Sequence, residues 1–190
     1  MSTVNGRTPR ADALRNRRRA LDAATALLTE PGGLLTVEAI AQRAGMGAGT
    51  VVRAFGGKGA LVDAAVADLL EPLVARGREV LERDGGTLAL PSFLAELMTF
   101  QAAHSSVPDQ LAGLDLPATT ALRAELVRVV DAMLGEAREQ GAIRSDIDPV
   151  LITSLVGETA FAVAKASRGN PGLTEAYLEV LIDGLRPRIP

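Results

Sequence analysis

The chain has no cysteine and no tryptophan, and it has only one histidine, one tyrosine and four phenylalanines among its 190 residues. Without cysteine it forms no disulfide, uses no thiolate nucleophile and offers no cysteine ligand to a metal. The single histidine, His104, cannot supply the two Glu-x-x-His pairs of a di-metal carboxylate bundle, and position 101 is Gln rather than Glu. No nucleophile-elbow pattern occurs. We therefore predict a protein that is not an enzyme and that requires no cofactor.

Sustained alternation of apolar and polar residues, the pattern of a half-buried strand, is also missing. Hydrophobic residues make up 47% of the chain and charged residues 23%, which is typical of a globular protein. Helix-forming residues dominate, so we expect an all-α fold of about nine helices. The longest apolar stretch, residues 150–166, contains Glu158 and Lys165, which favours a buried helix over a membrane span.

Positive charge is concentrated at the start of the chain. Residues 1–60 carry nine basic and four acidic side chains, a net charge of +5, whereas the whole chain carries −3. This asymmetry is typical of a protein that binds nucleic acid with one end. The arginine-rich run 15–19 is either a solvated helix face or a set of phosphate contacts. Residues 1–12 are predicted to be a mobile basic arm that reaches an adjacent minor groove.

A basic stretch before an apolar patch superficially resembles a secretory signal. Asp22 and Thr25 interrupt that patch, which makes it amphipathic rather than continuously apolar. We therefore predict no export, no membrane association and a cytoplasmic location.

The most informative segment is residues 34–59, LLTVEAIAQRAGMGAGTVVRAFGGKG. Its first part predicts a helix that Thr36 caps and Gly45 ends in the left-handed conformation. The apolar residues recur at positions i, i+3, i+4 and i+7, namely Val37, Ile40, Ala41 and Ala44. A second helix from about Ala48 would turn Val51 and Phe55 towards the first. The pattern predicts a helix-turn-helix whose outward residues, Ala48, Thr50 and Arg53, meet DNA.

Glycine-rich segments also bind phosphates in nucleotide-binding proteins, but the residues here do not fit those motifs. A dinucleotide fingerprint needs glycine where Thr50 stands and a strand before the loop. A phosphate-binding loop needs Ser or Thr after its lysine, whereas Gly59 follows Lys58. A purely structural helical hairpin is the remaining alternative.

Residues 13–62 resemble the N-terminal domain of the TetR family of bacterial transcriptional regulators. The stretch TVEAIAQRAGMGAGTVVRAFGGKGALVDA is similar to the family's helices two to four, and its first helix is matched by Leu21, Ala23, Ala24, Leu27 and Leu28. The resemblance implies that Thr36 and Lys58 contact phosphates, and the basic residue Arg43 is predicted to be a further DNA-binding residue. It also implies a recognition element formed by Gly47, Ala48, Gly49, Thr50, Val51 and Arg53.

The chain departs from the family pattern at several of these positions. The family usually has Ser at Gly47, Tyr at Val52, His or Tyr at Ala54, and a Pro-Ser or similar pair at positions 56 and 57. Several habitual phosphate donors are therefore absent. Such donors position a protein on DNA rather than read bases, so we expect the departures to affect affinity more than fold.

We expect a DNA-binding domain over residues 13–60 and a helical body over residues 61–190. The body's predicted helices cover about 58–83, 91–104, 109–114, 118–140, 149–167 and 174–185, with Asp148 capping the fifth. Pro72 is expected to kink or end the first of them. That joint either transmits a ligand signal or is a passive bend.

The last two predicted helices carry apolar stripes that are either a dimer interface or intramolecular core. A dimer is favoured by the need for two reading heads, and the resemblance implies a four-helix interface from these helices. The predicted interface residues are Leu151, Leu155, Ala162, Tyr177, Leu181 and Leu185.

The resemblance further implies a small-molecule effector within the body. An apolar pocket is predicted from Phe93, Leu97, Phe100 and Phe161, with Gln101, His104 or Glu158 as polar anchor. The alternatives are an ordinary phenylalanine core, a C-capping role for His104, and a buried pair between Glu158 and an arginine such as Arg123.

Together these features predict a ligand-responsive repressor that binds palindromic double-stranded operator DNA as a homodimer. The alternatives are a dimeric structural or regulatory protein whose DNA head is weakened, or a sequence-neutral DNA-packaging protein.

Overall fold

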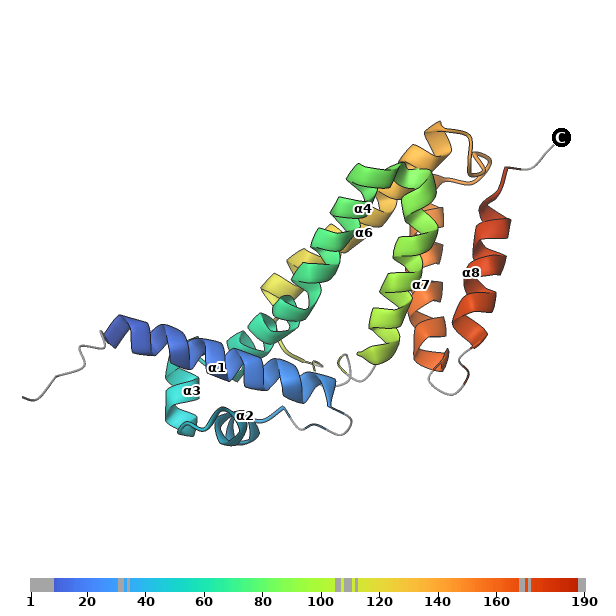
Figure 1. Ribbon diagram of the computed structural model, residues 1–190. Coiled ribbons are helices and arrows are strands. Elements are labelled where there is room, and N and C mark those ends of the chain that lie inside the picture. Colours follow the sequence, from blue (N-terminus) through green and yellow to red (C-terminus); the bar gives the residue numbers. More distant parts are fainter. Residues whose placement is uncertain are drawn as a thin grey trace, which may run out of the picture. The chain divides into compact units, whose positions relative to one another are not determined.

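The computed structural model describes residues 9–30, 33, 35–104, 107, 111, 113–167, 170 and 172–187, which form seven helices and no strand (Figure 1). The all-α class is confirmed for these residues, but the expected number of about nine helices is not. The element α4 contains both helices that the sequence pattern places on either side of residues 84–86, joined at a non-helical break at Gly85. The short helix predicted at 109–114 lies largely outside the described residues.

The chain divides into two compact units. The first contains residues Met1–Leu69 and Ser106–Thr119, and the second contains Leu70–Ser105 and Thr120–Pro190. The first unit therefore extends past the predicted boundary at residue 60 and includes the start of two helices that continue into the second unit.

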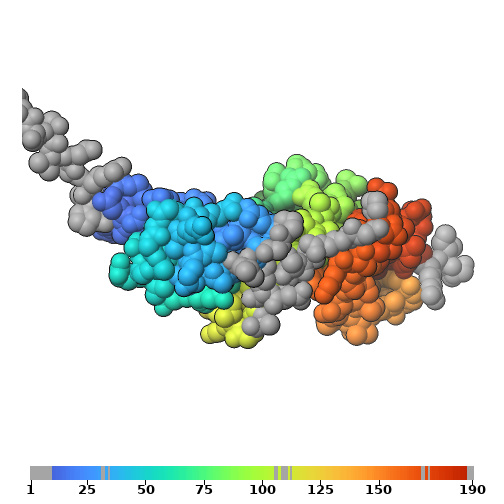
Figure 2. All heavy atoms as spheres, turned by 90° about the horizontal axis from the view of Figure 1, so that it is seen from below, coloured from blue at the N-terminus to red at the C-terminus, as the bar shows by residue number. Residues whose placement is uncertain are grey.

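Three helices pack against one another in the first unit: α1 (Pro9–Thr29), α2 (Val37–Ala44) and α3 (Ala48–Phe55). In Figure 2 their atoms, blue to cyan, form one continuous surface. Their shared core contains Ala20, Ala24, Leu28, Ile40, Val51, Leu61 and Val62. Because α1 begins at Pro9, residues 9–12 belong to a helix rather than to the predicted arm, and residues 1–8 lie outside the described part.

The two predicted ends of α2 are confirmed. The Ala39 N–H donates to Thr36 Oγ1 at 3.1 Å, which closes the N-terminal end. At the other end Gly45 has φ 62° and ψ 44°, the left-handed conformation that glycine adopts without steric cost. These caps hold the turn between α2 and α3.

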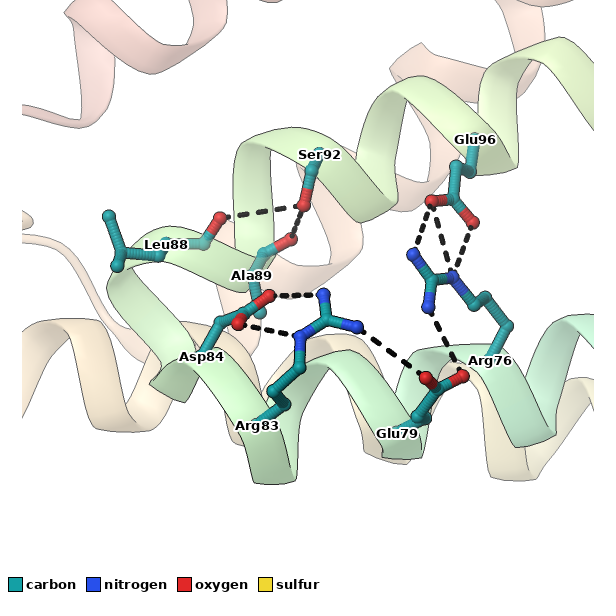
Figure 3. Close-up of polar contacts among 8 residues, drawn as sticks. All are labelled: Arg76, Glu79, Arg83, Asp84, Leu88, Ala89, Ser92 and Glu96. Atoms are coloured by element: carbon teal, nitrogen blue, oxygen red, sulfur yellow. Dashed lines mark hydrogen bonds and ion pairs between the residues drawn. The ribbon is translucent and has the colours of Figure 1, made fainter.

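The second unit begins within α4 (Lys58–Ala103), which folds back on itself at Gly85, where φ is 71° and ψ is 162°. The two arms, residues 58–84 and 86–103, run antiparallel (Figure 1). Figure 3 shows Arg76 between Glu79 of its own arm and Glu96 of the other. The helix does not end at Pro72, and the second arm begins before Pro91, the predicted start.

The remaining helices are α6 (Pro117–Glu139), α7 (Pro149–Ala166) and α8 (Gly172–Leu185), close to their predicted ranges. As predicted, Asp148 caps α7, with its Oδ1 accepting from the Val150 N–H at 2.8 Å. The core of the second unit joins α4 to α6, α7 and α8 through Val80, Leu90, Phe93, Leu94, Val129, Met133, Ile152, Val156 and Leu185.

By length and composition, α7 is the one helix among the described residues that is apolar enough to cross a membrane. Ile152, Val156, Ala160 and Ala164 bury one side of it within the second unit. Most of its other residues are exposed, including Leu151 and Leu155.

Candidate nucleic-acid interface

The outer face of α3 presents Arg53 to solvent and buries two apolar side chains beneath it. Val51 and Phe55, one turn apart, face the core, and Val51 is only 1% exposed. Arg53 lies between them in sequence and is exposed, with its Nη2 donating weakly to Thr50 Oγ1 at 3.4 Å. Val51 therefore supports the helix from inside rather than offering a side chain to DNA, although it was counted in the recognition element.

At the N-terminal end of α3, Gly47 occupies the cap position without a side chain that can accept a hydrogen bond. Its carbonyl oxygen accepts from the Thr50 N–H at 2.9 Å. The helix N-terminus carries partial positive charge and N–H groups that suit an anion. Replacement of the family's usual serine by Gly47 therefore leaves this end suited to a DNA phosphate.

Sequence reasoning did not select Val52, yet its side chain is 42% exposed beside Arg53. A branched apolar group at the surface of a recognition helix suits the methyl group of thymine in the major groove. The helical spacing indicates this exposure, because Val52 lies outside the buried stripe formed by Val51 and Phe55.

Thr36 and Lys58, the two predicted phosphate contacts, and Arg43, predicted to bind DNA, have different surroundings. The Thr36 hydroxyl accepts from Ala39 and keeps its own O–H as a donor for phosphate. Lys58, at the start of α4, is exposed and has no hydrogen bond or ion pair to any described residue. Arg43 Nη1 instead pairs with Glu30 Oε1 at 2.6 Å, so a phosphate would have to compete with that carboxylate.

Two consecutive glycines connect α3 to α4 in conformations that the family's usual Pro-Ser pair does not favour. Gly56 has φ 80° and Gly57 has φ 145°. Proline holds φ near −65°, so it cannot occupy position 56 in this backbone. The glycine at position 56 therefore allows a backbone conformation that proline does not, and the departure also removes a donor.

Asp63, on α4, holds the N-terminus of α6 within the first unit. Its Oδ2 accepts from the Ala118 N–H at 2.9 Å, and its Oδ1 accepts from the Thr119 N–H at 2.8 Å and from the Thr119 hydroxyl at 2.7 Å. Burial raises the pKa of Asp63, but the hydrogen bonds from Thr119 and Ala118 together outweigh it and leave the pKa below its ordinary value. Sequence reasoning missed this contact because 55 residues separate the partners.

In the second unit, two of the predicted effector residues are core residues. Phe93 has no exposed surface, and a Cβ placed at Gly77 would lie 2.7 Å from Phe93 Cζ and 2.8 Å from Val129 Cγ1. Leu97 is buried in the same core. The close packing around Phe93 leaves no room beside Gly77 for another group, which favours the ordinary-core alternative for Phe93.

Phe100, Gln101 and His104 lie together near the end of the second arm of α4. The rings of Phe100 and His104 are 4.2 Å apart, and His104 Nδ1 donates to the Phe100 carbonyl oxygen at 2.8 Å. This capping contact agrees with the C-terminal role that was the alternative for His104. Gln101 Oε1 is buried without a hydrogen-bond partner among the described residues.

Glu158 and Phe161 do not occupy the buried positions expected of them. Both side chains are exposed on α7, so the carboxylate of Glu158 requires no buried partner such as Arg123. The apolar sequence around Glu158 suggested burial, but only one side of α7 packs within the chain.

The predicted dimer residues divide into exposed and buried groups. Leu151, Leu155 and Ala162 are exposed at spacings of four and seven residues along α7, hence on one face. On α8, Tyr177 and Leu181 are half-buried, and Leu185 is buried in the core of its own chain. Leu185 therefore belongs to the core rather than to an interface. Val180 on the same helix is exposed, so its side chain is available for an interface.

A compact three-helix unit with a capped α2, a glycine turn and an α3 that exposes Arg53 defines a helix-turn-helix protein. Sequence profiles place it more closely. Residues 20–65 match the bacterial regulatory proteins of the tetR family, and residues 86–187 match the C-terminal domain of SbtR-like transcriptional regulators. The chain belongs to the TetR family and is a DNA-binding transcriptional regulator rather than an enzyme.

Solved structures agree with this assignment. A TetR transcription regulatory protein from Mycobacterium vanbaalenii is 33% identical, with a TM-score of 0.65 over 94% of this chain and 99% of that one. A TetR regulator from Streptomyces coelicolor is 26% identical, with a TM-score of 0.64 over 91% of this chain and 99% of that one.

The transcriptional regulator FadR from Bacillus subtilis, solved in complex with stearoyl-CoA, shares the fold at 18% identity. Its TM-score is 0.73 over 89% of this chain and 99% of that one. A search of curated protein sequences found no match.

Proposed function

We propose that this regulator is a ligand-responsive repressor that binds a palindromic operator as a homodimer in the cytoplasm. The proposed DNA binding is supported by the arrangement of side chains on α3. Val51 and Phe55 on its buried side fix the outward position of Arg53. An exposed arginine on a recognition helix suits bidentate contact with guanine. Thr50 and Val52 on the same helix complete the base-contacting surface, and Thr36 and Lys58 supply phosphate contacts.

The dimer proposal rests on the exposed apolar face of α7. Leu151 and Leu155 are each 58% exposed, and Val180 on the adjacent α8 is 72% exposed. Burying such side chains contributes roughly 25 cal/mol per Å² of apolar surface. A two-fold interface on this face would also join two reading heads, as a palindromic operator requires.

The effector proposal rests on Gln101. A buried amide oxygen without a partner is costly, so a ligand that donates an N–H or O–H there would be stabilised. Phe100 and His104, whose rings contact each other, lie on the same turn of the helix as Gln101 and offer ring surface to a ligand. The neighbour FadR is described with stearoyl-CoA, a ligand with a long apolar chain. We accordingly propose a largely apolar effector with at least one hydrogen-bond donor.

The test is selection of randomised duplexes by the purified protein, followed by titration of the enriched duplex and a scrambled one at two salt concentrations. We expect a palindrome bound on the order of a thousandfold more tightly than the scramble. Salt-sensitive binding without enrichment would favour the sequence-neutral packaging protein. Absence of any binding would favour the dimeric protein with a weakened DNA head, for which the departures at Gly47, Val52 and Ala54 and the missing phosphate donors are the motivation.

The effector is tested with the operator obtained in this way. A library of apolar compounds bearing hydroxyl or amide donors is screened for release of the operator duplex. Gln101→Leu removes the unpartnered oxygen while keeping a similar side-chain volume, and we expect it to lose the response to a releasing compound without losing operator affinity. An unchanged response would exclude Gln101 as the anchor.

A further inference from the structure

Two arginines of α1 reach the C-terminal ends of both helices of the helix-turn-helix. Arg17 Nη1 donates to the carbonyl oxygen of Ala54, the penultimate residue of α3, at 2.6 Å. Arg19 Nη2 donates to the carbonyl oxygen of Ala44, the last residue of α2, at 2.5 Å. Both contacts join residues more than 20 positions apart and lie within the first unit.

The accepting carbonyls are ones that the helices themselves leave unpaired. The last carbonyls of a helix have no partner within it. Among those of α3, Val52 O accepts from the Gly56 N–H at 2.8 Å, while Ala54 O accepts from Arg17. At the end of α2, the carbonyl oxygens of residues 41 and 42 accept hydrogen bonds from N–H groups of the turn, and the carbonyl oxygen of Ala44 accepts from Arg19. Each guanidinium thus supplies a donor where the local turn supplies none.

The charge and shape of these side chains suit the position. A helix C-terminus carries partial negative charge, so a cation there is favourable. The Arg17 guanidinium also lies over the Phe55 ring, with Cζ 4.1 Å from the ring centroid. Arg17 therefore contacts both residues that directly follow Arg53 in α3.

We infer that Arg17 is a positioning residue for the DNA reader, with Arg19 in a supporting role, and that Arg17 sets the orientation of α3 rather than binding a phosphate. This inference rests on the proposed sequence-specific DNA binding. Because Arg17 anchors positions 54 and 55, it determines where Arg53 is held against the base edges. Loss of the contact lowers discrimination between sequences while leaving sequence-independent phosphate binding intact.

Arg15 provides a matched control on the same helix. It is exposed like Arg17, but it pairs with Asp12 within α1 and makes no hydrogen bond or ion pair with the described residues of α2 or α3. Arg15→Ala and Arg17→Ala therefore remove the same charge from the same element. A difference between the two variants reports the contacts to Ala54 and Phe55 and not the net charge.

The experiment measures operator and scrambled-duplex affinity over a salt series for both variants. Relative to Arg15→Ala, we expect Arg17→Ala to lose about tenfold in operator affinity, with less than a twofold change on the scrambled duplex and the same salt slope. Equal losses on both duplexes with a slope flatter by about one would show a phosphate contact and overturn the inference. Identical behaviour of the two variants would also overturn it.

Arg17→Lys separates charge from geometry. It keeps the positive charge and loses the planar guanidinium over Phe55, so we expect it to discriminate less well than the wild type. Full wild-type discrimination in Arg17→Lys would show that charge alone suffices and would contradict the positioning role.

Failure of the proposed function has a different signature. If the wild-type protein selects no preferred duplex, sequence-specific binding is absent. Thermal unfolding then tests by itself whether Arg17 holds the end of α3. Arg17→Ala is expected to melt at a lower temperature than Arg15→Ala, because only the former leaves a helix-end carbonyl without its donor. Equal melting temperatures would contradict a role of Arg17 in holding the end of α3.

Discussion

The two compact units differ in the surface that they expose. Side chains close helix ends in both units: Thr36 and Arg19 on α2, Arg17 on α3 and Asp63 on α6 in the first, and Asp148 on α7 and Arg144 on α8 in the second. Both units also bury an apolar core, and in the second close packing at Gly77 joins α4 to α6. The first unit exposes Arg53 on the outer side of α3. The second devotes most of its apolar residues to its core and leaves one helix, α7, with an apolar surface exposed.

The largest expected effect comes from that exposed surface. Leu155→Glu places a charge in the proposed interface, so we expect monomers and a loss of at least about a hundredfold in operator affinity, because two linked heads bind far more tightly than one. Sedimentation velocity and operator titration measure both.

Val127→Glu is the control, since Val127 is equally exposed but lies on α6 outside the proposed face. It is expected to remain dimeric. Persistence of the dimer in Leu155→Glu at micromolar concentration would place the interface elsewhere.

The second effect concerns the reader itself. Arg53→Ala is expected to weaken operator binding by about 1–3 kcal/mol, roughly fivefold to 150-fold, with a much smaller effect on a scrambled duplex. Lys58→Ala should instead weaken both duplexes and reduce the salt slope by about one. Fluorescence anisotropy over a salt series distinguishes them. Equal losses on both duplexes in Arg53→Ala would identify a phosphate contact rather than base reading.

A third effect tests the packing of the second unit. Gly77→Ala adds a methyl group against the buried Phe93 ring and Val129, so we expect a loss of about 1–3 kcal/mol in the free energy of unfolding. Gly135→Ala is the matched change on α6, where a Cβ meets nothing within 4 Å. It should stabilise the protein by about 0.5–1 kcal/mol. Urea unfolding measures both, and a neutral Gly77→Ala would show that the core yields more easily than its contacts indicate.

The smallest effect is a pH dependence in the first unit. The folded-state pKa of Asp63 lies below its ordinary value of 3.8, so its contribution to stability is complete above that value and is lost as the pH falls through the folded pKa. Asp63→Asn cannot ionise, and we expect its stability to fall less than that of the wild type between about pH 6 and pH 3. Chemical denaturation at both pH values provides the comparison. Parallel losses would assign the acid sensitivity to other carboxyl groups.

Local rules explain most of what could be predicted from sequence. The caps Thr36, Gly45 and Asp148 involve neighbours within four residues, and each was predicted and confirmed. The ranges of α6, α7 and α8 follow in the same way from helical periodicity and turn residues. The break at Gly85 falls within the predicted connection at residues 84–86. The predicted helix start at Pro91 was wrong, because Pro91 lies inside the second arm of α4.

Burial could not be read from periodicity alone. Phe93 and Phe161 are both phenylalanines in apolar helices, yet Phe93 is enclosed by the core and Phe161 is exposed. Glu158 was expected to be buried because its helix is apolar, but that helix packs along a single side. An apolar stripe indicates that a surface must be covered, not whether the same chain or another copy covers it.

The sequence by itself determined the all-helical class, the helix-turn-helix and the outward place of Arg53, because these depend on residue spacing and capping within a few turns. Tertiary structure decided the partners of the α1 arginines. Arg15, Arg17 and Arg19 are alike in a sequence, but one pairs within its own helix and two reach Ala54 and Ala44. The physical reason is that a helix-end carbonyl acquires a distant donor only when packing brings the two helices together.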